Sequence, residues 1–168
     1  MKINVLENDE QLITSMYHQI SNVITENKTK MIYYINNTLI ETNFLIGKII
    51  VENEQNGNIR AEYGKDILKK LSNQFGSGFS LSGLYNMRLF YNRYKNFQPL
   101  AWNLSWSHYC YLIYIEDDDE RSFYEKECIN SKWSKRELKR QIDSSLFQRL
   151  LSDGKTNKKK VLELSKKG

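Results

Sequence analysis

The sequence predicts an all-α protein, a compact multi-helix domain with one or two helix-turn-helix-like units. One proline and 8 glycines among 168 residues are too few chain breakers for a turn-rich β-sandwich. No segment sustains the apolar-polar alternation of a strand between turn signals. The one alternative that the sequence allows is a short hairpin around residues 97–106. Apolar residues instead recur at spacings of three and four, which predicts roughly seven helices.

The composition excludes several other classes. Hydrophobic residues are 40% and charged residues 27%, as in globular domains. Two cysteines, Cys110 and Cys128, are too few for a disulfide scaffold or a four-cysteine zinc site. No apolar run approaches the ~20 residues that span a bilayer, and the N-terminus carries acids where a signal peptide is apolar. We therefore expect a soluble, reduced, cytoplasmic protein with no membrane partner.

The first half of the chain predicts three helices. In the helix over 8–25, apolar residues beginning with Leu12 follow spacings of four and three. The helix over 29–53 is apolar enough to be central, and Gly57 beyond it suits a C-terminal stop. The helix over 62–75 has one apolar face and ends at a Gly-Ser-Gly turn over 76–78.

The second half repeats one type of helix start, an aromatic residue directly before a serine. These pairs are Phe79-Ser80, Trp106-Ser107 and Trp133-Ser134. With each serine as N-cap, the aromatic residue can pack on the apolar fourth helical residue as a hydrophobic staple. Helices are therefore predicted to begin near 81, 108 and 135, and Glu137 would complete a capping box with Ser134. Asp117 can cap a further helix over 118–130.

Two segments have the layout of a helix-turn-helix. Helices over 62–75 and 81–95 are joined by a short turn, and residues 121–142 repeat this arrangement with a turn at 130–132. The second helix of each carries a polar stripe. The first stripe could contact phosphates and base edges, with Arg88 and Asn92 as the candidates for base contacts, and the second could track a phosphate backbone. Either stripe could equally be an ordinary solvated face. The first stripe consists of Tyr85, Arg88, Asn92 and Lys95. The second is a basic cluster of Lys135, Arg136, Lys139 and Arg140.

The net charge of +5 is unevenly distributed. Residues 85–168 hold 17 basic and 11 acidic groups, whereas residues 1–84 hold 8 and 9, so a polyanion surface should lie in the second half. Residues 152–168 alone carry six lysines and two carboxylates. We predict a helical domain over 1–151 and a lysine-rich tail or linker over 152–168, and a tail of this kind is more often solvated than binding.

The residues do not predict a catalytic or metal site. The acidic run at 117–120 would point its carboxylates in different directions, so we interpret it as a solvated helix start. His18 has no metal-ligating residue at a ligand spacing. His108 lies two residues from Cys110, but packing or capping explains it better than a nucleophilic pair. No phosphate-loop or hydrolase motif is present, so we expect no catalysis, cofactor or metal.

Several segments together resemble the N-terminal domain of the YhcG family, bacterial proteins grouped with the PD-(D/E)XK nucleases and often found beside restriction-modification genes. The resemblance covers about residues 35–153. The segments that carry it are IGKIIVENEQNG at 46–57, RAEYGK at 60–65, LKKLS at 68–72, FGSGFS at 75–80, NMRLFY at 86–91, LSWSHY at 104–109, FYEKEC at 123–128 and WSKRELKRQIDSSLFQRL at 133–150.

The resemblance implies a helical domain proposed to bind DNA, followed in the family by a nuclease domain. The family's nuclease motif, a Pro-Asp pair followed by Asp/Glu-x-Lys, belongs to that second half. This sequence does not contain the motif, since its one proline, Pro99, is followed by leucine. We therefore expect a non-catalytic DNA-binding or targeting module, with the nuclease domain supplied in cis or in trans. The alternative is a protein–protein docking or dimerisation module, a homodimer or a restriction-modification subunit, anchored by aromatic residues at 104–109.

The DNA-binding role is predicted for a defined set of residues, some from the two stripes and some from the family resemblance. The set is Arg60, Tyr85, Asn86, Arg88, Asn92, Arg93, Lys95, Ser107, His108, Lys135, Arg136, Lys139 and Arg140.

Overall fold

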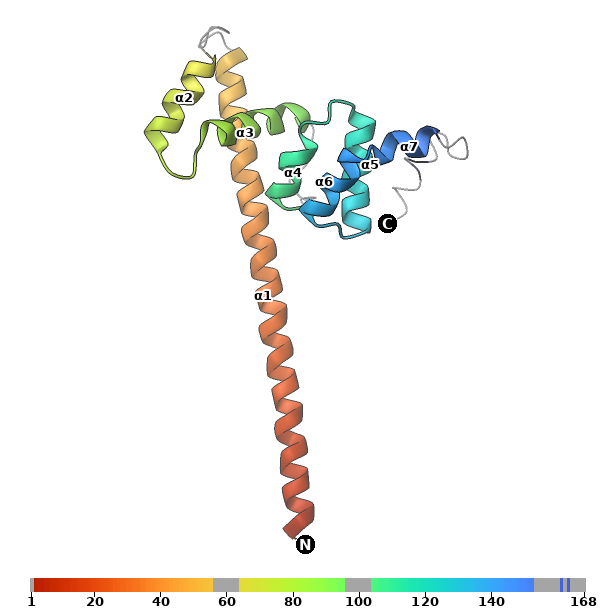
Figure 1. Cartoon of the computed structure of the whole chain (residues 1–168). Helices are drawn as coiled ribbons and strands as arrows, with labels where there is room; N and C mark the ends of the chain where they lie inside the picture. Colours follow the sequence, from red (N-terminus) through yellow and green to blue (C-terminus); the bar gives the residue numbers. More distant parts are fainter. Residues whose placement is uncertain (1, 56–63, 96–103, 153–160, 162, 164–168) are drawn as a thin grey trace. The chain divides into compact units, whose positions relative to one another are not determined.

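The computed structural model describes residues 2–55, 64–95, 104–152, 161 and 163, and over these it contains seven helices and no strand (Figure 1). The prediction of an all-α fold is confirmed. None of the described helices is long and apolar enough to cross a membrane. The helices are α1 Lys2–Gln55, α2 Gly64–Phe75, α3 Leu81–Arg93, α4 Trp106–Leu112, α5 Asp118–Asn130, α6 Lys135–Asp143 and α7 Leu146–Ser152.

The chain divides into two compact units, residues 1–38 and residues 39–168. The first unit consists of α1 up to Thr38. The two helices predicted over 8–25 and 29–53 are wrong as separate elements, because α1 is continuous from Lys2 to Gln55. The junction contains neither glycine nor proline, and Asn27 Nδ2 donates to the Val23 carbonyl within the helix at 2.8 Å. A polar stretch therefore interrupts the apolar pattern without ending the helix.

In the second unit, a small core joins α1, α2 and α3. It is built from Ile50 of α1, Leu68 of α2, and Leu84 and Met87 of α3. Gly47 of α1 lies against α3 so closely that a Cβ there would stand 2.0 Å from the Met87 carbonyl oxygen. Only glycine permits this contact between the two helix backbones.

A larger core joins α3 to the helices that follow it. Phe90 of α3 is fully buried, and its ring centroid lies 5.0 Å from that of Tyr109 and 5.3 Å from that of Trp106, both of α4. Tyr124, Leu138 and Phe147 bring α5, α6 and α7 into the same cluster. The core also includes Val161, which is 2% exposed and lies within the segment expected to be a tail.

Three of the four predicted N-caps are confirmed. Ser80 Oγ accepts from the Gly83 amide at 3.1 Å, Asp117 Oδ1 from the Glu120 amide at 2.7 Å, and Ser134 Oγ from the Glu137 amide at 3.2 Å. Each helix consequently begins at the residue after its cap. The capping box predicted at Ser134 is incomplete, because the Glu137 carboxylate accepts from Arg140 and Gln141 instead.

The start of α4 differs from the prediction. The N-cap of α4 is Ser105 and not Ser107, since His108 stands three residues on and its Nδ1 accepts from the Ser105 amide at 3.3 Å. Trp106 is then the first helical residue and packs on Phe90, so no staple forms there. After α6 the chain turns at Ser145, with φ of 52°, and continues as the separate helix α7.

Candidate nucleic-acid interface

The basic cluster lies on α6, which is held firmly from its inner side. Leu138 is fully buried, and the Tyr124 hydroxyl of α5 donates to the Gln141 carbonyl at 3.2 Å while accepting from the Phe147 amide at 3.2 Å. The four cations of the cluster are all exposed. A rigid helix therefore presents them together to solvent.

The connection between α5 and α6 spans four residues, 131–134. The Trp133 amide donates to the Cys128 carbonyl at 3.0 Å, and Lys132 adopts a positive φ of 50°. His108 Nε2 lies 3.0 Å from the Trp133 carbonyl, which ties this turn to α4. Helices α5 and α6 are thus joined by a short turn that is fixed at both ends.

Two cations of the cluster have a carboxylate partner and two do not. Arg140 contacts Glu137 at 2.6 Å, and Lys139 contacts Asp143. The hydrogen bond from Arg140 lowers the pKa of Glu137, and the hydrogen bond to Asp143 raises the pKa of Lys139, so both pairs stay charged at neutral pH.

Lys135 and Arg136, in the first turn of α6, form no ion pair or side-chain hydrogen bond with any residue that the structure describes. The helix N-terminus adds its own attraction for anions at this point. The first turn of α6, directly after its N-cap Ser134, is therefore the part of the cluster whose positive charge is most available to a ligand.

The stripe on α3 is more fully engaged. Arg88 Nε donates to the Glu54 carboxylate of α1 at 2.8 Å, so its charge is compensated. Tyr85 and Asn92 are exposed, and Lys95 lies just beyond the end of α3 with its ammonium 5.9 Å from the Tyr91 ring centroid. The stripe thus keeps two hydrogen-bonding side chains and one lysine facing solvent.

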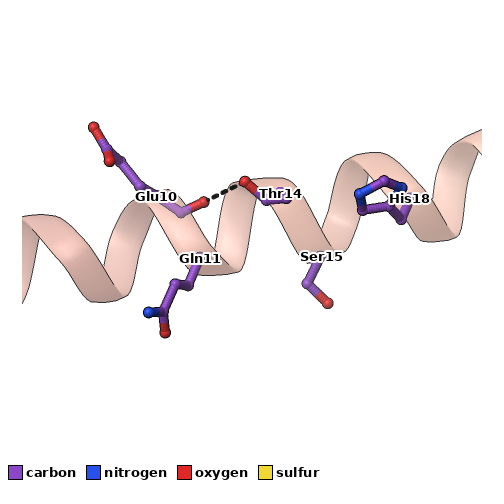
Figure 2. Close-up of a pocket in the computed structure, with 5 residues that line it drawn as sticks. All are labelled: Glu10, Gln11, Thr14, Ser15 and His18. Atoms are coloured by element: carbon purple, nitrogen blue, oxygen red, sulfur yellow. Dashed lines mark hydrogen bonds between the residues drawn. The ribbon is translucent and has the colours of Figure 1, made fainter.

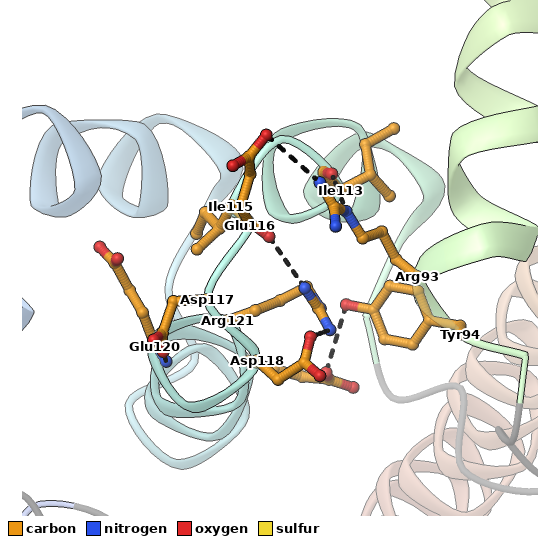
Figure 3. Close-up of polar contacts among 10 residues, drawn as sticks. Arg93, Tyr94, Ile113, Ile115, Glu116, Asp117, Asp118, Glu120 and Arg121 are labelled. Atoms are coloured by element: carbon orange, nitrogen blue, oxygen red, sulfur yellow. Dashed lines mark hydrogen bonds and ion pairs between the residues drawn. The ribbon is translucent and has the colours of Figure 1, made fainter.

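Two of the predicted site residues connect α3 to α4 and the turn after it. Asn86 Nδ2 donates to Cys110 Sγ at 3.8 Å, and its Oδ1 accepts from the Tyr114 hydroxyl at 2.7 Å. Arg93 Nε donates to the Ile113 carbonyl at 3.3 Å, and its guanidinium lies 3.8 Å from Glu116 (Figure 3). Both side chains therefore hold α3 against α4 and the turn that follows it.

The remaining predicted residues fall in different places. Ser107 is exposed on α4, and Arg60 lies outside the described residues. Both ring nitrogens of His108 are occupied by Ser105 and the Trp133 carbonyl, which confirms the capping interpretation over a pairing with Cys110. Burial raises the pKa of the Cys110 thiol, so the thiolate needed for nucleophilic attack is disfavoured at neutral pH.

Segment 104–109 does not offer an exposed aromatic anchor. Leu104 and Tyr109 are buried, and Trp106 packs on Phe90. A docking surface centred on this segment is therefore not supported by its burial.

Sequence reasoning missed a buried arginine at the centre of the second unit. Arg121 is 6% exposed, donates from Nη1 to the Ile115 carbonyl at 2.8 Å and pairs with Asp118 (Figure 3). Its guanidinium lies 5.5 Å from the Tyr94 ring centroid. Residue spacing gave no signal for this role, because its carbonyl and ring partners come from outside α5.

The Tyr94 hydroxyl extends this network by donating to Glu125 Oε2 at 3.3 Å. Burial raises the pKa of Glu125, although the hydrogen bond from Tyr94 and the charge of Arg121 act in the opposite direction. Arg121 and Tyr94 are buried, and the network braces the end of α3 against α5, which suits a structural role.

The acidic run at 117–120 is used for helix formation. Asp117 caps α5, and Asp118 contacts Arg121. In the described part of the chain, no three His, Cys, Asp or Glu side chains are grouped so as to hold a metal ion.

A shallow depression lies on the first unit, between residues of successive turns of α1 (Figure 2). Its lining residues are Glu10, Gln11, Thr14, Ser15 and His18. The Thr14 hydroxyl donates to the Glu10 carbonyl at 2.8 Å, as is common for threonine within a helix. All five residues come from one helix, so the depression has no opposing wall that would enclose a ligand.

Comparison with known proteins identifies the family. The model of the DUF1016 N-terminal domain matches residues 19–149. The chain belongs to this family. It is also 31% identical over 178 residues to "Putative nuclease YhcG" of Escherichia coli (strain K12), which confirms the predicted resemblance to the YhcG N-terminal domain. That alignment covers 82% of this chain and 48% of the relative, so the chain spans about half the length of the curated protein it matches. No solved structure matches the chain.

Proposed function

We propose that this DUF1016 N-terminal domain is a DNA-binding module of a YhcG-type nuclease, with α5, the four-residue turn and α6 as its helix-turn-helix unit. The observation that carries the proposal is the row of exposed cations on α6, in which Lys135 and Arg136 are unpaired among the described residues. Residues in the first turn of the second helix of such a unit are the ones that reach base edges.

The proposed mechanism is phosphate anchoring followed by limited contact with bases. Lys139 and Arg140 track the backbone, because each can exchange its carboxylate partner on the same helix for a phosphate. Arg136 is the candidate for a bidentate base contact. Each phosphate contact releases counterions, so binding weakens as salt rises.

The α3 stripe supplies a second contact in this proposal. Tyr85 and Asn92 provide hydrogen-bonding groups, and Lys95 provides a charge. Arg88 takes part only if Glu54 releases it, so its contribution is expected to be smaller than that of Arg136. Ser107, which is exposed on α4, is a further neutral contact in this proposal, whereas Asn86, Arg93 and His108 support the scaffold.

The catalytic step is assigned to a nuclease domain in cis or in trans. The support is that the relative is named a nuclease while this chain matches 48% of it. A targeting module of this kind would act in cytoplasmic DNA metabolism, including restriction-modification.

The proposal is tested by measuring duplex binding of the Lys135→Glu/Arg136→Glu variant by fluorescence anisotropy. The matched control is Lys69→Glu/Lys70→Glu, which makes the same charge change at exposed positions of α2. At 0.1 M salt we expect the α6 variant to lose at least about tenfold in affinity, and the α2 variant to lose less than about threefold. Equal losses, or no loss in the α6 variant, would remove α6 from the interface.

A further inference from the structure

The part of α1 that forms the first unit has an apolar side and a polar side. The apolar side chains recur at spacings of three and four, and each is 49–69% exposed. This apolar stripe consists of Leu12, Ile13, Met16, Tyr17, Ile20, Val23, Ile24, Met31, Tyr34 and Ile35. On the opposite side the helix carries Gln11, Ser15, His18, Asn22, Glu26 and Thr29, followed near the end of the unit by the exposed Tyr33.

The apolar stripe is large enough for a stable interface. Ten half-exposed side chains offering roughly 80–100 Å² each would supply about 800–1,000 Å², and specific interfaces bury about 800 Å² per partner. Helices of this kind are stabilised mainly by packing of the apolar side rather than by intrinsic propensity. An amphipathic helix with such a stripe therefore predicts a partner helix.

The charges beside the apolar stripe indicate which partner fits. Glu10 and Lys28 are 18 residues apart, five helical turns, so they lie on the same edge of the stripe. Acidic residues, Asp9 and Glu10, stand toward one end of the unit, and basic residues, Lys28 and Lys30, stand toward the other. In two identical helices that run antiparallel, like edges meet, and each Glu10 faces the partner's Lys28.

The same alignment also matches the apolar side chains. With Glu10 opposite the partner's Lys28, the pair is centred at residue 19, so Met16 lies within one residue of the position opposite the partner's Val23, and the two copies of Ile20 lie within two residues of each other along the pair. A parallel pair in register would set the acidic ends against each other and the basic ends against each other, which is unfavourable.

We propose that two copies of this chain associate through the apolar stripe of α1 as an antiparallel helix pair, with Glu10–Lys28 ion pairs at both ends. The interface is isologous, with one two-fold axis, and therefore closes as a dimer. It lies in a different unit from the α6 surface, so the two proposals succeed or fail separately.

Sedimentation velocity of the full 168-residue chain over a range of concentrations tests the dimer. We expect a dimer, and we expect Met16→Asp/Ile20→Asp to be monomeric with retained helical circular dichroism. The control Ser15→Asp/Asn22→Asp adds the same charges to the polar side and should stay dimeric. A wild-type chain that is monomeric up to 100 µM, on the order of 10⁻⁴ M, would overturn the proposal.

A charge exchange tests the antiparallel arrangement without disturbing the apolar side chains. Glu10→Lys and Lys28→Glu should each weaken the dimer about tenfold, and the double variant should restore it. Residues five turns apart on one helix cannot meet each other, so restoration requires contact between two copies. Single variants without effect, or a double variant that stays weakened, would overturn the antiparallel arrangement.

Discussion

Replacing Gly47 by alanine should destabilise the second unit, because α1 and α3 contact each other there. The added Cβ would lie 2.0 Å from the Met87 carbonyl oxygen, 2.7 Å from the Met87 carbonyl carbon and 3.0 Å from Tyr91 Cβ. Two of these atoms are backbone, so the helices must separate rather than a side chain rotate. Alanine gains about 1 kcal/mol in helix propensity, but overpacking costs about 1–3 kcal/mol or more. With backbone as the obstacle, we expect a net loss of about 2 kcal/mol.

Urea unfolding followed by tryptophan fluorescence measures this loss in the relevant unit, since all three tryptophans fall within residues 39–168. Gly83→Ala is a suitable control, because its Cβ would meet only Ser80 Oγ at 3.2 Å within a helix. That variant should unfold within about 1 kcal/mol of wild type. If Gly47→Ala were as stable as wild type, the close approach of α1 to α3 would be refuted.

Two further predictions concern α6 and the buried network. Ser134→Ala should cost about 1 kcal/mol in unfolding free energy, because the Glu137 amide loses its acceptor, and thermal denaturation should show a lower Tm. An unchanged Tm would contradict the cap. Burial raises the pKa of Glu125 above its ordinary 4.5, so the stabilisation from its proton is present at low pH and is lost as pH rises through the folded-state pKa. The wild type should therefore lose this contribution to its unfolding free energy between pH 4 and about pH 7, whereas Glu125→Gln, which cannot ionise, should not. Urea unfolding of both proteins at the two pH values measures the difference. A difference between the two proteins that does not change with pH would refute this assignment.

Local chemistry made the fold class and three helix starts predictable. An N-cap depends on a side chain and an amide three residues apart, so Ser80, Asp117 and Ser134 could be recognised from the sequence. The same reasoning failed at α4, where Ser105 and Ser107 compete within one turn. The choice there depends on His108 and on the burial of Trp106 against a distant phenylalanine.

The site was only partly predictable, since ion pairing across the fold decides which cations remain available. Arg88 is compensated by Glu54 and Arg93 contacts Glu116, and in the first pair the partners are 34 residues apart. Arg121 was missed for the same reason, because its tyrosine ring and its carbonyl partner come from outside α5. The α6 cluster was predictable because its neighbours in sequence are also its neighbours in space.

The central claim is that α6 contacts DNA phosphates through Lys139 and Arg140. It is tested most directly by the dependence of duplex affinity on salt, for the full chain and for Lys139→Ala/Arg140→Ala. The claim predicts a steep decline of log K with log salt in the wild type, with a slope reduced by about 2 in the variant. An identical slope and affinity in the two proteins would contradict it.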